Sequence, residues 1–185
     1  MSWTIPGTVI QIPRQDAEAI ESVFSAMFLG GDIVLSQVSG IAGLEPYAVQ
    51  NWVKRGFLSP PKQKRYSLRQ LCRVLNINAL KSVLPMDRIC GMLGYINGRL
   101  NDESDDVIDD SQLYFMFVKL AARSKELFNS QDRDAVLDSY LENYREPVPG
   151  AKERVKNVLR VMLTAWLAAR MRQKAEAMLN NMEGE

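Results

Sequence analysis

Two adjacent prolines, Pro60 and Pro61, constrain the fold of this 185-residue chain more than any other feature. Proline lacks a backbone N–H and disfavours helical backbone in the residue before it, so the surrounding stretch FLSPPKQKRYS, residues 57–67, is not helical. Apolar residues at helical spacing stand on both sides of this stretch. The chain is therefore expected to fold as helices interrupted by one extended turn, with little other strand.

Glycine divides the helical pattern that precedes the prolines. Residues 32–42 and 46–55 both carry apolar residues at spacings of three and four, with Gly43 between them and Gly56 after them. Pro46 suits the first turn of the second helix. Two short helices joined by a glycine turn have the lengths of a helix-turn-helix. The inward-facing side chains are expected to be Val38, Ile41, Val49 and Trp52.

The remaining segments are also helical in pattern, so the expected fold class is all-α with a short β-hairpin wing. Further helices are expected at residues 15–29, 68–84, 85–96, 112–128, 132–144 and 152–182. The expected organisation is an N-terminal helix (1–31), a winged helix-turn-helix domain (32–100), an acidic linker (101–110) and a helical dimerisation or effector domain (111–185).

Charge is divided unevenly along the chain although the net charge is only +1. Residues 46–100 hold ten basic residues and one acidic residue, and this excess predicts a polyanionic partner for that part alone. Residues 101–110, NDESDDVIDD, hold six acids and no base. They lack the glycine and ligand spacing of a calcium loop, so a solvated linker is favoured over a cation site. A third hypothesis is that this run masks the basic head in the absence of DNA.

The outward face of the second helix and the basic run after the prolines form the candidate binding surface. Tyr47, Gln50 and Asn51 are expected to face base edges, since amide side chains pair with adenine. Two interpretations stay open for the amides, base contacts or ordinary exposed helix residues. Trp52 and Tyr66 are expected in the core instead. Phosphate contacts are expected from Lys54, Arg55, Lys62, Lys64, Arg65 and Arg69.

These motifs resemble the N-terminal head of the MerR-type transcription regulators. The resemblance covers roughly residues 32–98, and LPMDRICGML, residues 84–93, resembles the helix pair that follows in that family. It implies a winged helix-turn-helix that binds pseudo-palindromic operator DNA as a homodimer. The whole chain resembles a bacterial domain-of-unknown-function family with such a head. The matching positions are Gly43, Leu44, Trp52, Gly56, Phe57, Leu58, Pro60, Arg65, Tyr66 and Leu71.

Three departures from the MerR-type pattern bear on function. The wing is short, with only Lys62, Gln63 and Lys64 between Pro61 and Arg65. Gln50 stands where the family usually has arginine on the recognition helix. The simple coiled-coil dimer of that family is replaced by the acidic run and about seventy-five residues of helical pattern.

The tail carries methionines and aromatics at helical spacing in YFMFVKL, residues 114–120, and VLRVMLTAWLAARM, residues 158–171. Packing of helices on one another explains most of them better than a ligand pocket does. Their surplus of apolar surface favours a homodimer contact. The tail is also where a small-molecule effector, as yet of unknown identity, is expected if the protein responds to one.

Several classes of protein are disfavoured by what the composition lacks. There is no histidine, no glycine-rich phosphate loop and no recognisable pair of catalytic carboxylates, so we expect neither an enzyme, a bound cofactor nor a metal site. Cys72 and Cys90 are too few for a disulfide framework and are expected to be reduced, in helices, in the cytoplasm. The longest apolar run, residues 161–169, is too short to span a membrane.

Two functions follow from this reading of the sequence. The first is a sequence-specific DNA-binding transcription regulator that binds as a dimer through the helix-turn-helix and the short basic wing. The alternative is a helical interaction module whose basic head binds an acidic protein partner.

Overall fold

The computed structural model describes residues 2–100, 102–124 and 133–183. It is mostly helical with a small two-stranded hairpin, which confirms the expected fold class. The elements in chain order are β1 (Ser2–Thr4), β2 (Gln11–Pro13), the 3-10 helix η1 (Arg14–Ala19), α1 (Ile20–Met27), β3 (Ile33–Val34), α2 (Leu35–Ala42), α3 (Pro46–Lys54), β4 (Arg65–Tyr66), α4 (Leu68–Leu80), α5 (Met86–Asn97), the 3-10 helix η2 (Glu103–Asp105), α6 (Asp110–Ala122), α8 (Arg133–Tyr140) and α9 (Ala151–Glu183).

Helix α4 is the centre of the molecule. It is buried on almost every side and packs against α2, α5, α6 and α9. Its start is defined by Ser67, whose hydroxyl accepts from the backbone N–H of Gln70 while the Gln70 side chain accepts from the Ser67 N–H. One apolar cluster runs from Trp3 to Trp166 through α4, so the head and the tail share a core.

The aromatic and methionine side chains of the tail fill this core. Tyr114, Phe117 and Met162 are fully buried. The Phe24 ring of α1 meets the Tyr114 ring edge-on at 5.5 Å between centroids. The Tyr114 hydroxyl donates to the backbone oxygen of Pro6 at 2.9 Å, and complete burial raises the pKa of this tyrosine. Most of the tail's apolar surplus is therefore used inside one copy of the chain.

The first residues form a hairpin where only a helix at 15–29 was expected. Strands β1 and β2 pair antiparallel with Trp3 opposite Ile12. The intervening loop packs so closely on α4 that a Cβ on Gly7, whose φ is +75°, would lie 2.2 Å from the Leu75 oxygen. Asn78 of α4 donates to the backbone oxygens of Gly7 and Ala42, each at 2.8 Å. The N-terminal segment thereby holds the helix-turn-helix against the body.

Several expected helix boundaries differ from the structure, and the largest differences concern residues 32–34, 15–19, 81–84 and 141–144. Residues 32–34 were expected to begin a helix, but Ile33 and Val34 form β3 and pair with β4. The helix expected over 68–84 ends at Leu80. The expected helix over 15–29 begins as the 3-10 turn η1. The parts of the helices expected at 112–128 and 132–144 that fall on residues 125–132 lie outside the described residues.

The acidic run is solvated only in its first half. Asp102, Ser104 and Asp105 are exposed, but Val107 and Ile108 are buried. The expectation of a solvated linker is therefore wrong for residues 106–110, because their two apolar side chains join the core and draw the neighbouring carboxylates against α4.

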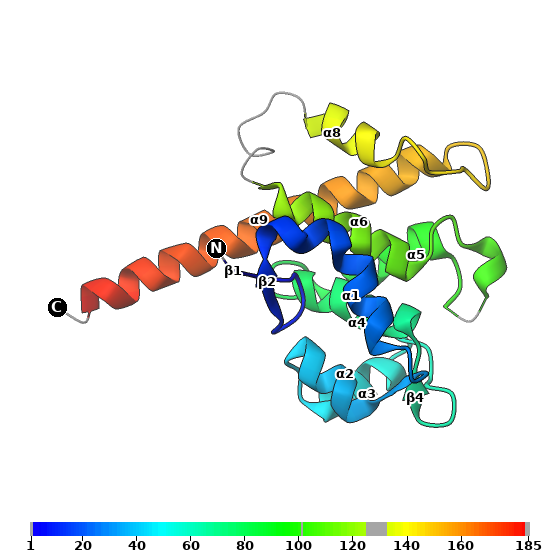
Figure 1. Ribbon diagram of the computed structural model, residues 1–185, viewed down its shortest axis with the longest axis horizontal. Coiled ribbons are helices and arrows are strands. Elements are labelled where there is room, and N and C mark those ends of the chain that lie inside the picture. Colours follow the sequence, from blue (N-terminus) through cyan, green and yellow to red (C-terminus); the bar gives the residue numbers. More distant parts are fainter. Residues whose placement is uncertain (1, 101, 125–132, 184–185) are drawn as a thin grey trace.

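The helix-turn-helix occupies one end of the molecule. Figure 1 shows α2, α3 and β4 together at the bottom of the view, α8 at the opposite side, and the C-terminal part of α9 extending beyond the body. Among the described helices, none is long and apolar enough to cross a membrane.

Candidate nucleic-acid interface

Helices α2 and α3 form the helix-turn-helix that the sequence predicts. Helix α2 ends at Gly43, which adopts the left-handed conformation with φ +63°, and the N–H of Leu44 donates back to the Ser39 oxygen at 3.0 Å. Pro46 then begins α3. A Cβ on Gly43 would lie 2.5 Å from Cγ1 of Val9, so the turn also fits tightly against the N-terminal loop.

Helix α3 has a buried apolar face and an exposed polar face. Val49 and Trp52 are buried, and the Lys81 ammonium lies 5.8 Å from the centre of the Trp52 ring. The expectation that Trp52 belongs to the core is confirmed. Tyr47 is 72% exposed. The other candidate residues of this helix, Gln50, Asn51 and Lys54, are exposed as well.

The wing is a tight turn rather than a long loop. Lys62 and Arg65 form an antiparallel bridge, with the Arg65 N–H donating to the Lys62 oxygen at 2.9 Å. The two intervening residues, Gln63 and Lys64, have φ of +49° and +62°. Residues with positive φ at both central positions make the turn that suits the twist of a hairpin, normally Asn-Gly. Gln63 and Lys64 adopt it at a cost of about 1 kcal/mol each.

The base of the wing is fixed to α4. Strand β4 pairs with β3, so that Tyr66 lies opposite Ile33, and the Tyr66 ring is buried as expected. The amide nitrogen of Gln70 donates to the backbone oxygen of Ser59 at 2.9 Å and to that of Pro60 at 3.1 Å. One side chain therefore joins the proline turn to the capping box of α4.

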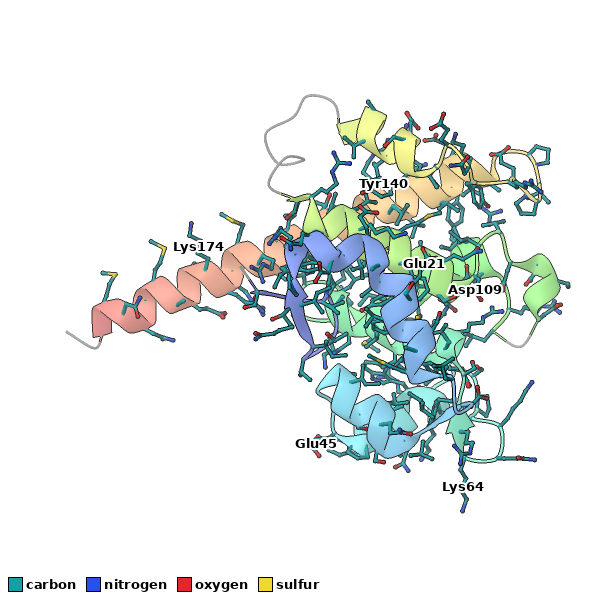
Figure 2. All side chains as sticks on the ribbon, viewed as in Figure 1. Glu21, Glu45, Lys64, Asp109, Tyr140 and Lys174 are labelled. Carbon is teal, nitrogen blue, oxygen red and sulfur yellow. The ribbon has the colours of Figure 1, made fainter. Side chains whose placement is uncertain are left out.

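Helix α3 and the wing border the same groove, which has a volume of about 470 Å³. Figure 2 shows Lys64 at the end of the molecule that carries α2 and α3, pointing away from the body. The groove lies between the two parts of the candidate surface, helix α3 and the wing. Its lining residues are Leu35, Gln50, Val53, Pro61, Lys64 and Tyr66.

The basic side chains of the candidate surface differ in their exposure and in their contacts with the rest of the protein. Lys54, Lys62 and Lys64 are exposed. The Arg55 guanidinium stacks 4.5 Å from the centre of the Phe57 ring and lies 3.9 Å from a carboxylate oxygen of Asp87, at an exposed site. The Arg65 guanidinium donates to the backbone oxygen of Asp32, the residue before β3, at 2.7 Å.

Arg69, another predicted phosphate contact, is engaged by the acidic run. It is bonded to Asp106 and lies 3.6 Å from Asp109, with its side chain only 20% exposed. Next to it, Arg73 and Asp110 form a buried pair at 3.4 Å. The acidic run therefore contacts α4, and the ion pairs that the described residues of this run form are with Arg69 and Arg73.

Burial sets the ionisation of this acidic cluster. Desolvation raises the pKa of Asp106 to about 6, against the opposing effect of Arg69. Desolvation also raises the pKa of Asp110, although Arg73 and Arg69 act in the other direction. Oδ1 of Asp106 is buried without a hydrogen-bond partner, which adds to the cost of its charge. These largely buried charges connect α4 to the acidic run and to the start of α6.

A cavity of about 770 Å³ lies between α1, α6, α8 and the acidic run. Figure 2 shows Glu21, Asp109 and Tyr140 around it. The Lys119 ammonium on its wall is paired with Glu21 at 2.7 Å, and Phe115 contributes an apolar surface. No sequence motif marks this cavity, because its walls come from elements more than a hundred residues apart. Within the described parts of the chain, no cluster of three or more potential metal ligands is found.

Comparison with known proteins gives a family likeness for part of the chain. A family model described as "Domain of unknown function (DUF1836)" matches residues 32–117, which extend from β3 into α6. "Uncharacterized protein YkrK" of Bacillus subtilis (strain 168) is 28% identical over 118 residues, which are 62% of this chain and 49% of that protein. The chain thus spans about half the length of this relative. No solved structure matches. The matched region contains the helix-turn-helix, the wing and the acidic cluster together, and it is similar to this domain family as one piece.

Proposed function

We propose that the protein is a sequence-specific DNA-binding transcription regulator. One observation carries the proposal: the exposed polar face of α3 and the basic turn of the wing border one groove at one end of the molecule. A helix that presents amides beside a cationic turn has the groups needed to read base edges and to hold phosphates. The excess of nine positive charges in residues 46–100 supports the same partner.

In the proposed complex, α3 enters the major groove and the wing meets the flanking backbone. Tyr47, Gln50 and Asn51 face the base edges. Phosphates are held by the exposed cations of α3 and the wing. The phosphate-binding residues are Lys54, Arg55, Lys62, Lys64 and Arg65. Arg69 is left out, because its guanidinium is engaged by the acidic cluster.

The regulator is proposed to act as a dimer on operators with two half-sites, since each copy has one helix-turn-helix. If a small-molecule effector acts on it, the cavity between α1, α6 and α8 is its proposed site. The Asp106–Arg69 bond connects that cavity to α4, beside the Gln70 contacts that hold the wing.

The experiment is a titration of fluorescent duplexes with the full chain, after selection of bound sequences from a random pool. Lys64→Ala should weaken binding to all duplexes alike and reduce the slope of log affinity against log salt by about 1. Gln50→Ala should instead relax preference at one or two base pairs, by about 1–3 kcal/mol. Arg145→Ala, which removes an exposed cation between α8 and α9, is the control. The proposal fails if no duplex binds at low salt.

A second function is favoured by the shortness of the wing. A two-residue turn has little reach toward DNA, and apolar side chains (Leu35, Val53 and Pro61) line the groove beside it. These features suit a helical interaction module that binds an acidic protein segment. Salt-dependent binding of an acidic peptide library to the full chain, with no affinity for any duplex, would establish this function instead.

A further inference from the structure

Another cavity, of about 380 Å³, lies where α9 leaves the body of the molecule. Three elements that are far apart in sequence form it: Arg14 begins η1, Ser124 follows α6, and the other walls come from α9 between residues 166 and 174. Figure 2 shows Lys174 on this part of α9, away from Lys64 and the helix-turn-helix. The cavity shares no lining residue with the groove beside α3 or with the cavity between α1, α6 and α8.

The charged side chains that line this cavity are all positive. They are Arg14, Arg170 and Lys174, and no carboxylate among the described residues lines it with them. Within the same part of the chain, none of the three takes part in an ion pair. Three other cations of α6 and α9 do have acidic partners at 2.7–2.8 Å: Lys119 with Glu21, Lys156 with Asp138, and Arg160 with Asp134.

Two tryptophans position the two arginines of the cavity. The Arg170 guanidinium lies 5.5 Å from the centre of the Trp166 ring. The Arg14 guanidinium lies 5.4 Å from the centre of the Trp3 ring, and the two rings meet edge-on with 6.4 Å between centroids. Arg14 also donates one hydrogen bond to the backbone oxygen of Ala122, at 2.7 Å. Because a guanidinium has five N–H donors, most of the Arg14 fork is left for a ligand.

The three cations repel one another in the absence of an anion. Burial, together with the positive charge of Arg170, lowers the pKa of Arg14. A guanidinium nevertheless keeps its proton at any physiological pH, so this repulsion is not relieved by deprotonation. A bound anion relieves it, and the anion is attracted by all three groups at once.

We propose that this cationic cavity binds a phosphate monoester whose organic part is apolar. A phosphate monoester carries nearly two negative charges at neutral pH and three acceptor oxygens, which suits three converging cations better than the single charge of a carboxylate does. The arginine forks pair with two phosphate oxygens each, and the lysine adds a point charge. The organic part lies against Trp166, Leu167 and Met171, which line the same cavity.

The shape of the site favours a small molecule over a nucleic acid. The cavity has the volume of an ordinary small-molecule site. A phosphate of the duplex backbone carries one charge and lies on a convex surface, so it cannot place an apolar group inside the cavity. Binding here is independent of the DNA-binding function proposed above, since the two surfaces have no residue in common.

The first test is calorimetric titration of the full chain with phenyl phosphate, in a phosphate-free buffer of low salt. One molecule should bind per chain, with a dissociation constant of about 10 µM to 1 mM. Lys174→Gln should weaken this binding about tenfold, and the fold should tolerate the change because Lys174 is exposed.

Arg172→Gln is the matched control, because it removes the same charge from the same helix. Arg172 donates to the backbone oxygen of Ser82 at 3.1 Å and does not line the cationic cavity, so this variant should bind phenyl phosphate as the wild type does. The absence of binding at about 5 mM phenyl phosphate, or an equal loss in the two variants, would overturn the proposal.

The second test identifies the ligand class with three further titrations. Benzoate keeps the ring and carries one charge, and inorganic phosphate keeps the charge and lacks the ring, so each should bind about tenfold more weakly than phenyl phosphate. Equal binding of benzoate would rule out the phosphate, and equal binding of inorganic phosphate would rule out the apolar part. Lys174→Gln should leave duplex binding unchanged. A loss of duplex affinity like that expected for Lys64→Ala would make the cluster a nucleic-acid contact instead.

Discussion

Single charged residues in this molecule differ in function according to what surrounds them. Lys64 and Arg69 are both basic residues of the positively charged segment 46–100, and they lie five positions apart. Lys64 lies on an exposed turn, whereas Arg69 lies on the central helix against three carboxylates. Net charge along the chain therefore predicts a basic region but not which of its cations are available to a partner.

Asp106 gives a prediction about pH. Its pKa of about 6 in the folded protein is above the ordinary 3.8, so the folded state binds this proton more tightly than the unfolded state does. Its contribution to the free energy of unfolding is fully present below about pH 4 and is lost as pH rises through about 6. In the NMR spectrum the Asp106 carboxyl should titrate near 6.

The cause of this shift is tested by removing the opposing cation. Arg69→Gln should raise the Asp106 midpoint further, because Arg69 favours the ionised form. Asp102→Asn, an exposed change in the same acidic run, should leave it unaltered. A midpoint near 4 in the wild type would show that the carboxylate is solvated after all.

At the scale of elements, the helix-turn-helix depends on its turn and on the N-terminal loop that supports it. Gly43 must adopt positive φ and must leave room for Val9, whose backbone N–H donates to Ile41 of α2 at 3.0 Å. Helix α2, its turn and the N-terminal loop are thus one structural unit.

Two glycine substitutions, one inside α2 and one at the residue that follows it, separate these requirements from helix propensity. Gly43→Ala should lower the free energy of unfolding by about 1–3 kcal/mol, since a Cβ there is strained and meets Val9. Gly40→Ala, inside the same helix with open space around it, should raise that free energy by about 0.5–1 kcal/mol. Urea denaturation of both variants measures the contrast. Equal effects of the two substitutions would mean that the turn is not held as described.

At the scale of the whole molecule, α4 packs against elements of both ends. Its side chains Leu71, Val74 and Leu75 lie in the same cluster as Phe117 of α6 and Leu159 of α9. The acidic run adds one buried ion pair between α4 and α6, that of Arg73 and Asp110. The division into domains at residues 101–110 stays a prediction.

The shared core leads to a prediction about cooperativity. Calorimetric unfolding of the full chain should show a single transition, with equal calorimetric and van't Hoff enthalpies for the monomer. A fragment ending at residue 100 should lack a cooperative transition, because it exposes the α6-facing and α9-facing sides of α4. Two separate transitions, or a stably folded fragment, would instead establish independent domains.

The sequence alone determined the helical class, the helix-turn-helix with its glycine and proline boundaries, and the burial of Trp52 and Tyr66. These follow from local rules, namely apolar spacing and backbone restriction, which act within a few residues. The tertiary structure decided the rest. The N-terminal hairpin has strands too short to show a period, and the pairing of residues 33–34 with the wing joins segments thirty residues apart. The roles of Arg69 and of residues 106–110 depend on which charges are brought together and removed from water, and that depends on packing between distant segments rather than on their order in the chain.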